Sequence, residues 1–145
     1  MIKMFSMSDL QKCSDLYVRV FNGEPWNEKW TNDTAHARLL EFVENKRFLG
    51  YTLWESDELI GAIFCHVKTF YSGNEIFIEE MWISPDYQRK GCGKLLMDGV
   101  EKYAKENGIT SIALLTGKDK PAFNFYKKLD YNHLEFLAFM YKHIK

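Results

Sequence analysis

The sequence has few cysteines, no clustered histidines and no long apolar run, and each absence excludes a class of protein. Its three cysteines lie far apart, so neither a disulfide framework nor a zinc site is expected. Its four histidines form no HxxxH pair, so we expect no bound metal. No segment approaches the roughly 20 apolar residues of a membrane span, and the N-terminus has no signal-peptide apolar run. We therefore expect a cytoplasmic protein that binds no membrane.

An excess of charge of one sign is missing as well. The 19 Lys+Arg and 20 Asp+Glu residues give a formal net charge of −1, which argues against a general nucleic-acid-binding role. The charge is uneven along the chain, with a net of −5 over residues 1–85 and +4 over residues 86–145. The basic part could face a polyanionic small ligand and the acidic part a cationic one. The alternative is an ordinary surface on which folding mixes both signs.

The composition is that of one ordinary folded domain. With 145 residues, 46% of them apolar, the chain can form one hydrophobic core, so we expect a single domain over residues 1–145. Hydrophobic periodicity and turn residues predict strands over residues 2–5, 48–55, 59–70, 75–84, 111–116 and 134–141. They predict helices over residues 8–21, from Asp33 or Thr34 onward, 91–107 and 121–129, the first opened by a capping box of Ser8 and Gln11. This order predicts an α/β fold with a central, mostly antiparallel mixed sheet and parallel crossover units in its C-terminal half.

The segment most informative about chemistry joins the strand over 75–84 to the helix over 91–107. It reads Gln88-Arg89-Lys90-Gly91-Cys92-Gly93. A glycine-rich turn into a helix presents unpaired backbone N–H groups and the positive end of the helix dipole, which suits a pyrophosphate. Arg89, Lys90 and Lys94 add positive charge. No GK[ST] follows and the third glycine of the dinucleotide fingerprint is absent, so neither a Walker loop nor that fingerprint is present.

Two motifs in the chain resemble those of a known family. The string MWISPDYQRKGCG from Met81 to Gly93 closely resembles the acetyl-CoA motif of the Gcn5-related N-acetyltransferases, [apolar]-x-V-x-P-x-x-[QR]-x-x-G-x-[GA]. Downstream, Asp119, Ala122, Phe125, Tyr126 and Leu129 fit the family pattern N-x-x-A-x-x-F-Y-x-x-x-G-F. The order of elements agrees too, so the resemblance covers essentially the whole chain. Asp119 stands where asparagine is usual, Asp130-Tyr131 replaces Gly-Phe, and the tail is short; these departures concern the acceptor side more than the CoA side.

The resemblance implies acetyl-CoA as the cosubstrate. Its pyrophosphate would lie on the amides of the glycine turn, and its pantetheine arm would pair with the main chain of Met81 and Ile83 like an added strand. A backbone N–H near Met81 and Trp82 would bind the oxyanion. The residues implied for cofactor binding are Met81, Trp82, Ile83, Gln88, Arg89, Lys90, Gly91, Cys92, Gly93, Lys94, Asp119, Asn124 and Tyr126. For Asp119, capping of the last helix is an alternative role.

Two adjacent glutamates are the candidates for the catalytic base. The acceptor amine arrives mostly protonated, so a carboxylate should remove its proton. Glu79 and Glu80 lie mid-strand, where family members often carry an acidic base. Strand alternation predicts that the two point to opposite faces of the sheet, with Phe77, Met81 and Ile83 on the face of Glu79. We favour Glu79 and keep Glu80 second; exposure to solvent or pairing with a lysine is the alternative for each.

Tyr126 is the candidate catalytic acid. It resembles the family tyrosine whose hydroxyl reaches the CoA sulfur and can protonate the departing thiolate. The alternative is a core tyrosine on an amphipathic helix.

The segment between the first two helices is expected to wall the acceptor site. Glu24, Trp26 and Trp30, together with Glu28, would form an aromatic and acidic wall that suits a cationic amine. The alternative is a hydrophobic latch onto the sheet. The segment is similar to that of aminoglycoside 6′-N-acetyltransferase relatives.

We therefore expect an enzyme that transfers the acetyl group of acetyl-CoA to a primary amine. The expected acceptor is a small cationic amine of the aminoglycoside, polyamine or amino-acid kind. One alternative is acetylation of a protein N-terminus or lysine. An alternative of another class is a non-catalytic acyl-CoA-binding sensor module. The oligomeric state stays open, a homodimer included.

Overall fold

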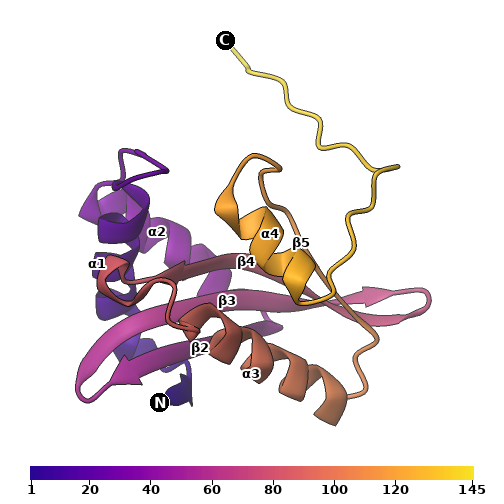
Figure 1. The fold of residues 1–145 in the computed structure, drawn as a ribbon, viewed down its shortest axis with the longest axis horizontal. Coiled ribbons are helices and arrows are strands. Elements are labelled where there is room, and N and C mark those ends of the chain that lie inside the picture. The colour runs from indigo at the N-terminus through magenta and orange to yellow at the C-terminus, as the bar shows by residue number, and fades with distance from the viewer. The chain divides into compact units, whose positions relative to one another are not determined.

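The computed structural model describes all residues, 1–145, and the chain divides into two compact units, Met1–Leu114 and Leu115–Lys145. The first unit contains the whole sheet, and the second contains the last helix and the C-terminal segment (Figure 1). No helix in the chain is both long enough and apolar enough to cross a bilayer.

The first unit is built on a five-stranded sheet whose spatial order follows the chain. Its strands are β1 (Ile2–Met4), β2 (Phe48–Glu55), β3 (Glu58–Phe70), β4 (Gly73–Ile83) and β5 (Ser111–Leu114). Neighbouring strands are antiparallel except β4 and β5, which are parallel. The helix α3 (Cys92–Glu106) makes the crossover that a parallel pair needs. The predicted mixed α/β sheet is confirmed, with one parallel crossover unit.

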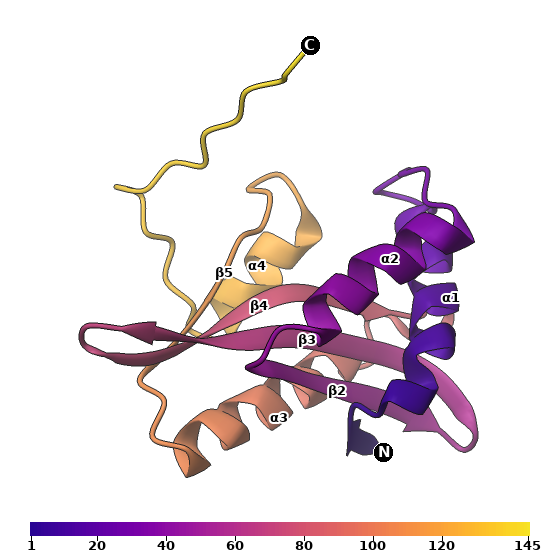
Figure 2. The ribbon, with the colours of Figure 1, turned by 180° about the vertical axis from the view of Figure 1, so that it is seen from behind.

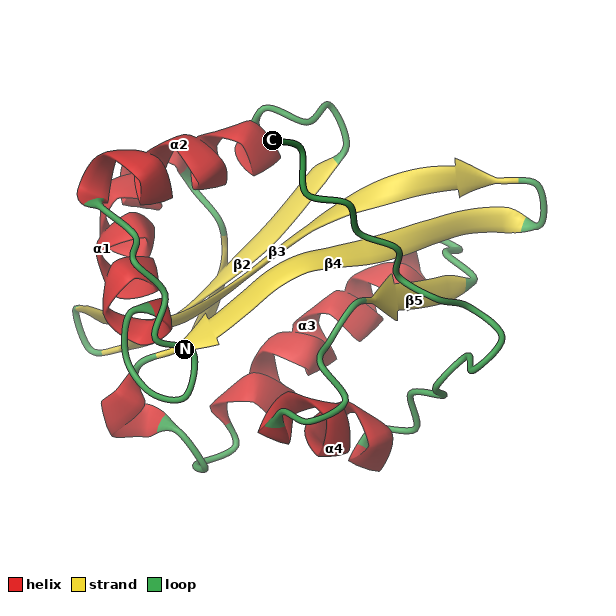
Figure 3. Cartoon of the chain, turned by 90° about the horizontal axis from the view of Figure 1, so that it is seen from above, coloured by secondary structure: helices red, strands yellow, loops and turns green.

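The two faces of this sheet carry different helices. The helices α1 (Leu10–Phe21) and α2 (Asn32–Val43) cover one face and α3 covers the other (Figure 2, Figure 3). Strand alternation explains the division, because Ala62 and Phe64 pack in the core under α1 and α2, whereas the side chain of Ile63 points away from that core. These two faces are called the α1/α2 face and the α3 face below.

The predicted start of the first helix is wrong. A short 3₁₀ turn, Met7–Asp9, precedes α1, and the Ser8 hydroxyl contacts the Ser6 hydroxyl at 3.0 Å instead of capping the helix. The Gln11 amide donates to Asp15 one turn ahead, so it does not reach back to form a capping box. The capping box lies at α2, where Thr31 and Thr34 bond reciprocally and the helix begins at Asn32.

The second unit contains α4 (Pro121–Lys128), and the strand predicted over residues 134–141 is absent. Residues 129–145 form neither helix nor strand, and the apolar side chains of Phe136, Leu137, Phe139, Met140 and Tyr141 are exposed. A strand exists only where its N–H and C=O groups find a paired partner, and this segment has no such partner.

Candidate functional site

A β-bulge in β4 determines where the two glutamates point. Phe64 of β3 pairs with Glu80, but the next residue, Cys65, pairs with Ile78, so Glu79 is an extra residue in β4. An extra residue shifts the alternation of all side chains that follow it in the strand. Consecutive side chains on the two sides of a bulge can therefore share one face of the sheet.

Glu79 and Glu80 do share a face, so the expectation of opposite faces was wrong. Glu80 accepts hydrogen bonds from the Tyr17 hydroxyl on α1 and from Arg38 Nε on α2, the latter at 2.9 Å. Oε1 of Glu79 lies 2.7 Å from Nδ1 of His66. His66 is two residues beyond Phe64 in β3, so both glutamates lie on the α1/α2 face.

Met81 and Ile83 point to the α3 face, which separates them from Glu79. Met81 is the cross-strand partner of Ile63, and the Ile83 side chain lies beside Gly61 and close to Leu96 of α3. The predicted common face of Phe77, Glu79, Met81 and Ile83 therefore breaks at the bulge. Trp82 is buried on the α1/α2 face, where its Nε1 donates to the Cys13 carbonyl at 3.2 Å.

The C-terminal half of β4 has a strand on one side only. The pairing of β4 with β5 runs from Glu75 to Ile78 and ends there, because β5 stops at Leu114 (Figure 3). From Glu80 to Ile83 the strand pairs with β3, and from Glu79 onward it has no β5 partner on its other edge. Backbone N–H and C=O groups along such an edge can pair with an added extended group.

The glycine turn leads from β4 to an uncapped helix. Gly91 is the N-cap of α3 with a left-handed φ of 81°, and no side chain bonds to the amides of the first turn. An ideal Cβ at Gly91 would meet no atom within 4 Å, so its backbone conformation, not crowding, requires glycine. The amides and the positive end of the helix dipole therefore remain available to an anion.

The polar side chains of the turn are held locally. Gln88 Nε2 donates to the Ile83 carbonyl at 3.2 Å, and the Lys90 ammonium lies 5.4 Å from the centroid of the Tyr87 ring. Lys94 pairs with Asp98 one turn along α3. Arg89 has a positive φ of 62°, and Cys92 is buried. Cys92 therefore contributes its backbone amide to the turn and not its thiol.

The expected acceptor wall is largely packed against the protein itself. Trp26 lies 5.6 Å from the Phe21 ring, and Trp30 lies 5.2 Å from the Tyr17 ring, both against the core of the first unit. The guanidinium of Arg38 lies 5.6 Å from the Trp30 ring. The two rings therefore pack on residues of α1, whereas the alternative for both tryptophans was a latch onto the sheet.

The two glutamates of that wall are also engaged in local contacts. Glu24 accepts from Asn27 Nδ2 at 3.1 Å, and Glu28 accepts from Trp30 Nε1 at 2.7 Å. Both bonds are exposed, so the two carboxylates lie at the surface of this segment.

The second unit holds the remaining predicted site residues. Tyr126 is buried in α4, with its ring 5.0 Å from Phe125 and 5.7 Å from Tyr131. Asn124 is exposed on the same helix. The N-cap of α4 is Lys120 and no side chain caps the helix, so the alternative role of Asp119 as its cap was wrong.

Three site residues were not predicted from the sequence: Tyr17, Arg38 and His66. Tyr17 is 63 residues from Glu80 and Arg38 is 42 residues from it, so no local spacing could indicate the cluster. His66 had one signal, because it is the only ionisable imidazole in an otherwise apolar stretch of β3. A polar residue in such a strand is locally unfavourable and is often functional.

The surroundings of Tyr17 and Arg38 in this cluster keep both donors protonated. Burial raises the pKa of the Tyr17 hydroxyl, and the adjacent Glu80 carboxylate raises it further, so Tyr17 stays a donor. Burial by itself would lower the pKa of Arg38, but its hydrogen bond and charge interaction with Glu80 outweigh burial and raise it. Glu80 therefore accepts hydrogen bonds from two groups that stay protonated, the Tyr17 hydroxyl and the Arg38 guanidinium.

Replacing Tyr17 by phenylalanine is expected to lower the free energy of unfolding by about 1–3 kcal/mol at pH 7, because a hydrogen bond to a buried carboxylate is lost. A raised folded-state pKa contributes stability below the unfolded-state value, near 10 for tyrosine, and that contribution is lost as the pH rises further. The difference between wild type and variant should thus shrink above about pH 10. Urea denaturation at pH 7 and at pH 10.5, roughly one half-unit above the unfolded-state pKa of tyrosine, measures this difference in stability. A difference that does not change with pH would contradict the hydrogen bond from Tyr17 to Glu80.

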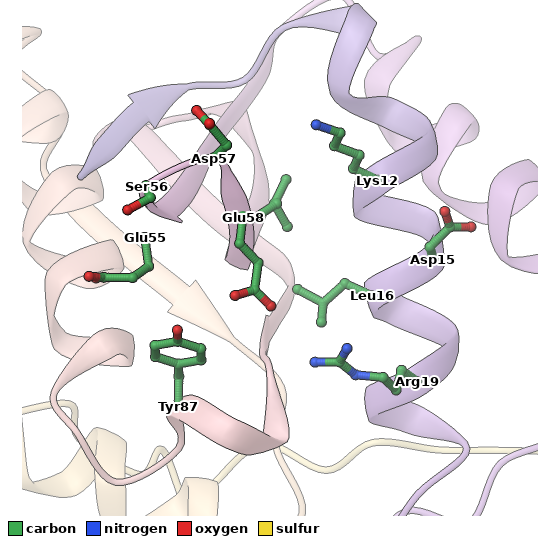
Figure 4. A pocket seen from close by; sticks show the side chains of 10 residues that line it. Lys12, Asp15, Leu16, Arg19, Glu55, Ser56, Asp57, Glu58 and Tyr87 are labelled. Atoms are coloured by element: carbon green, nitrogen blue, oxygen red, sulfur yellow. The ribbon is translucent and has the colours of Figure 1, made fainter.

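A surface hollow of about 860 Å³ lies in the first unit between α1 and the β2–β3 hairpin (Figure 4). Its lining consists mostly of charged side chains, four carboxylates and two cations: Asp15, Glu55, Asp57, Glu58, Lys12 and Arg19. The other lining residues are Leu16, Ser56, Leu59 and Tyr87. It includes none of the predicted site residues. Its lining therefore contains neither glutamate of the bulge and no residue from Gln88 to Lys94.

A comparison with protein families decides what kind of chain this is. The acetyltransferase (GNAT) family model matches residues 10–131. The chain belongs to the GNAT family. The match to the GNAT model includes β4, the glycine turn and α4, so it spans both units of the chain.

Individual GNAT proteins resemble the chain over most of its length. An uncharacterized N-acetyltransferase from Methanocaldococcus jannaschii is 30% identical over 140 residues, which cover 92% of this chain and 61% of that protein. The [ribosomal protein bS18]-alanine N-acetyltransferase of Haemophilus influenzae is 27% identical over 92 residues, which cover 63% of this chain and 60% of that protein. The chain thus spans about 60% of the length of these curated relatives.

A solved structure shows the same fold. AAC(6′)-Iy in complex with the bisubstrate analogue CoA-S-monomethyl-acetylneamine is 17% identical and has a TM-score of 0.77. The alignment covers 99% of this chain and 98% of that chain. The GNAT fold predicted from the two motifs is confirmed.

Proposed function

We propose that this GNAT protein transfers the acetyl group of acetyl-CoA to a primary amine. The observation that carries the proposal is the continuous path formed by β4 and α3. The edge of β4 from Glu79 to Ile83 has no β5 partner, and the strand leads through the glycine turn to the uncapped amides at Gly91. An extended pantetheine arm suits the first feature, and a pyrophosphate suits the second.

The donor side of the proposed site uses main-chain atoms. Met81 and Ile83 would pair with the pantetheine amides, and an N–H near Trp82 would bind the oxyanion of the tetrahedral intermediate. The amides of the glycine turn would bind the pyrophosphate, with Arg89 and Lys90 adding positive charge. In this arrangement the donor side needs no side chain of β4, which leaves the Glu79 carboxylate for the acceptor side.

Glu79 is the proposed base for the acceptor amine. Oε2 of the Glu80 carboxylate already accepts from Tyr17 and Arg38, so the protein's own donors occupy it. Glu79 lies at the bulge, where the open edge of β4 begins, and its Oε1 lies 2.7 Å from Nδ1 of His66. Its carboxylate would take the proton of the amine as the nitrogen bonds to the thioester carbonyl carbon.

Tyr126 is the proposed acid for the second half of the reaction. When the tetrahedral intermediate collapses, the C–S bond breaks and the CoA thiolate leaves with the bonding electron pair. By its match to the family tyrosine, the Tyr126 hydroxyl would supply the proton that converts the thiolate into the free thiol. The balanced products are an acetylated amine and CoA.

A small cationic amine is the proposed acceptor. Glu24 and Glu28 place negative charge on the segment between α1 and α2, and Glu79 and Glu80 add acidic groups on the face that these helices cover. Charge attraction therefore favours a cation. The likeness to AAC(6′)-Iy with its acetylneamine analogue supports such an amine, whereas the bS18-alanine relative favours a protein N-terminus as the second candidate.

A turnover screen tests the proposed function. The protein is incubated with acetyl-CoA and, in turn, with aminoglycosides, polyamines, amino acids and peptides with a free N-terminus, and the release of free thiol is measured. We expect release that depends on the amine and is highest with a small polycation. Binding of acetyl-CoA without turnover on any amine would instead favour a sensor module.

Replacing Tyr126 by phenylalanine is expected to lower kcat by about tenfold or more while the affinity for acetyl-CoA stays near that of the wild type. The ring and its packing against Phe125 and Tyr131 are kept, so only the hydroxyl is lost. Steady-state kinetics and isothermal titration with CoA measure the two quantities. Equal kcat in wild type and variant would remove Tyr126 from catalysis.

A further inference from the structure

The imidazole of His66 lies directly beside the proposed base. Nδ1 of His66 is 2.7 Å from Oε1 of Glu79, and both side chains are mostly buried, with exposed fractions of 20% and 23%. The two residues come from neighbouring strands, β3 and β4. Neither the family motifs nor the spacing of the sequence points to this pair.

The surroundings of His66 restrict its ring. Phe48 of β2 and Phe77 of β4 are its cross-strand partners on the two sides, and the Phe77 ring centroid lies 5.9 Å from the imidazole. Flanking aromatic side chains reduce the rotamers open to the imidazole. The ring can therefore hold one orientation toward Glu79.

The bulge makes such a restraint necessary. Glu79 is the unpaired extra residue of β4, so the regular ladder of the sheet does not fix its backbone as it fixes its neighbours. A carboxylate on a long side chain at such a position has several rotamers to choose from, and ordering it costs free energy. A contact through one oxygen leaves the other oxygen in a defined place.

We propose that His66 is a positioning residue for Glu79, because its Nδ1 holds Oε1 of the carboxylate so that Oε2 meets the acceptor amine. This inference rests on the proposed function, in which Glu79 takes the proton of the amine. His66 acts on the reaction through Glu79 and touches neither substrate. Its role is to keep the base in the geometry for proton transfer.

The test is a double-mutant cycle of His66 and Glu79. Changing His66 to phenylalanine removes the ring nitrogens but keeps an aromatic ring between Phe48 and Phe77, and it is expected to lower kcat by about tenfold with little change in KM for acetyl-CoA. Changing His66 to asparagine should restore most of the loss, because its amide nitrogen can occupy nearly the place of Nδ1. Thermal unfolding of each variant controls for loss of the fold.

The decisive measurement is His66→Phe in the Glu79→Gln background. If His66 acts through Glu79, the second substitution should lower kcat no further once the carboxylate is gone. An undiminished tenfold loss in that background, or no recovery with asparagine, would overturn the inference while Glu79 remains the base. Full activity of the single variant Glu79→Gln would overturn the proposed base, and the inference with it.

Discussion

Replacing Gly91 by aspartate is expected to weaken the binding of acetyl-CoA by about 100-fold, which is about 2.7 kcal/mol. The carboxylate would stand at the N-cap of α3, where the amides of the first turn are proposed to bind the pyrophosphate. Repulsion between the two negative charges and competition for the same N–H groups both act against the ligand. The same substitution is compatible with the empty helix, because aspartate caps helices well and tolerates a left-handed backbone.

Asparagine at position 91 is the matched control. It has nearly the shape of aspartate, adopts the same φ of 81° with similar ease, and carries no charge. An ideal Cβ at this position meets no atom within 4 Å, so the left-handed φ is the main cost, and both variants bear it alike. We expect the two variants to unfold near the same temperature without ligand, below wild type, and only the asparagine variant to keep a substantial rise in Tm with acetyl-CoA. An equal rise in the two variants would place the pyrophosphate elsewhere.

The local elements of this protein could be predicted from the sequence because each has a local cause. The strand over residues 48–55 was confirmed residue for residue, and the glycine turn was placed correctly at the start of α3. Apolar alternation, helical periodicity and a glycine that adopts a left-handed conformation each depend only on residues close together in the sequence. The order of elements and the mixed sheet follow from them.

The geometry of the acceptor side could not be predicted, because it depends on pairing between distant segments. The bulge at Glu79 arises from the register of β4 against β3, and strict alternation assumes a regular register. The bonds from Tyr17 and Arg38 to Glu80 join three separate elements. The strand expected over residues 134–141 failed for the same reason, since an apolar pattern supplies no partner for its backbone.

Replacing Glu79 by glutamine is expected to lower kcat by about 10²–10⁴-fold, the range for the loss of a general base. The amide keeps the shape of the side chain but cannot take the proton of the amine. The affinity for acetyl-CoA should change little, because the proposed donor contacts come from main-chain atoms and from the amides of α3. The loss should be largest near neutral pH and become smaller as the pH rises, because more of the amine then arrives already deprotonated.

Glu80→Gln is the control that separates catalysis from structure. Glu80 lies next in the chain and on the same face, but its carboxylate is shared by Tyr17 and Arg38. Its replacement leaves the buried Tyr17 hydroxyl and the partly exposed Arg38 guanidinium without their acceptor charge. We expect Glu80→Gln to lower the unfolding temperature more than Glu79→Gln does, and to alter the shape of the pH–rate profile less. The opposite result would be that Glu80→Gln removes the pH dependence of the rate while Glu79→Gln keeps it. The proton of the amine would then go to Glu80, and the bulge would serve to bring Glu80 to the acceptor amine.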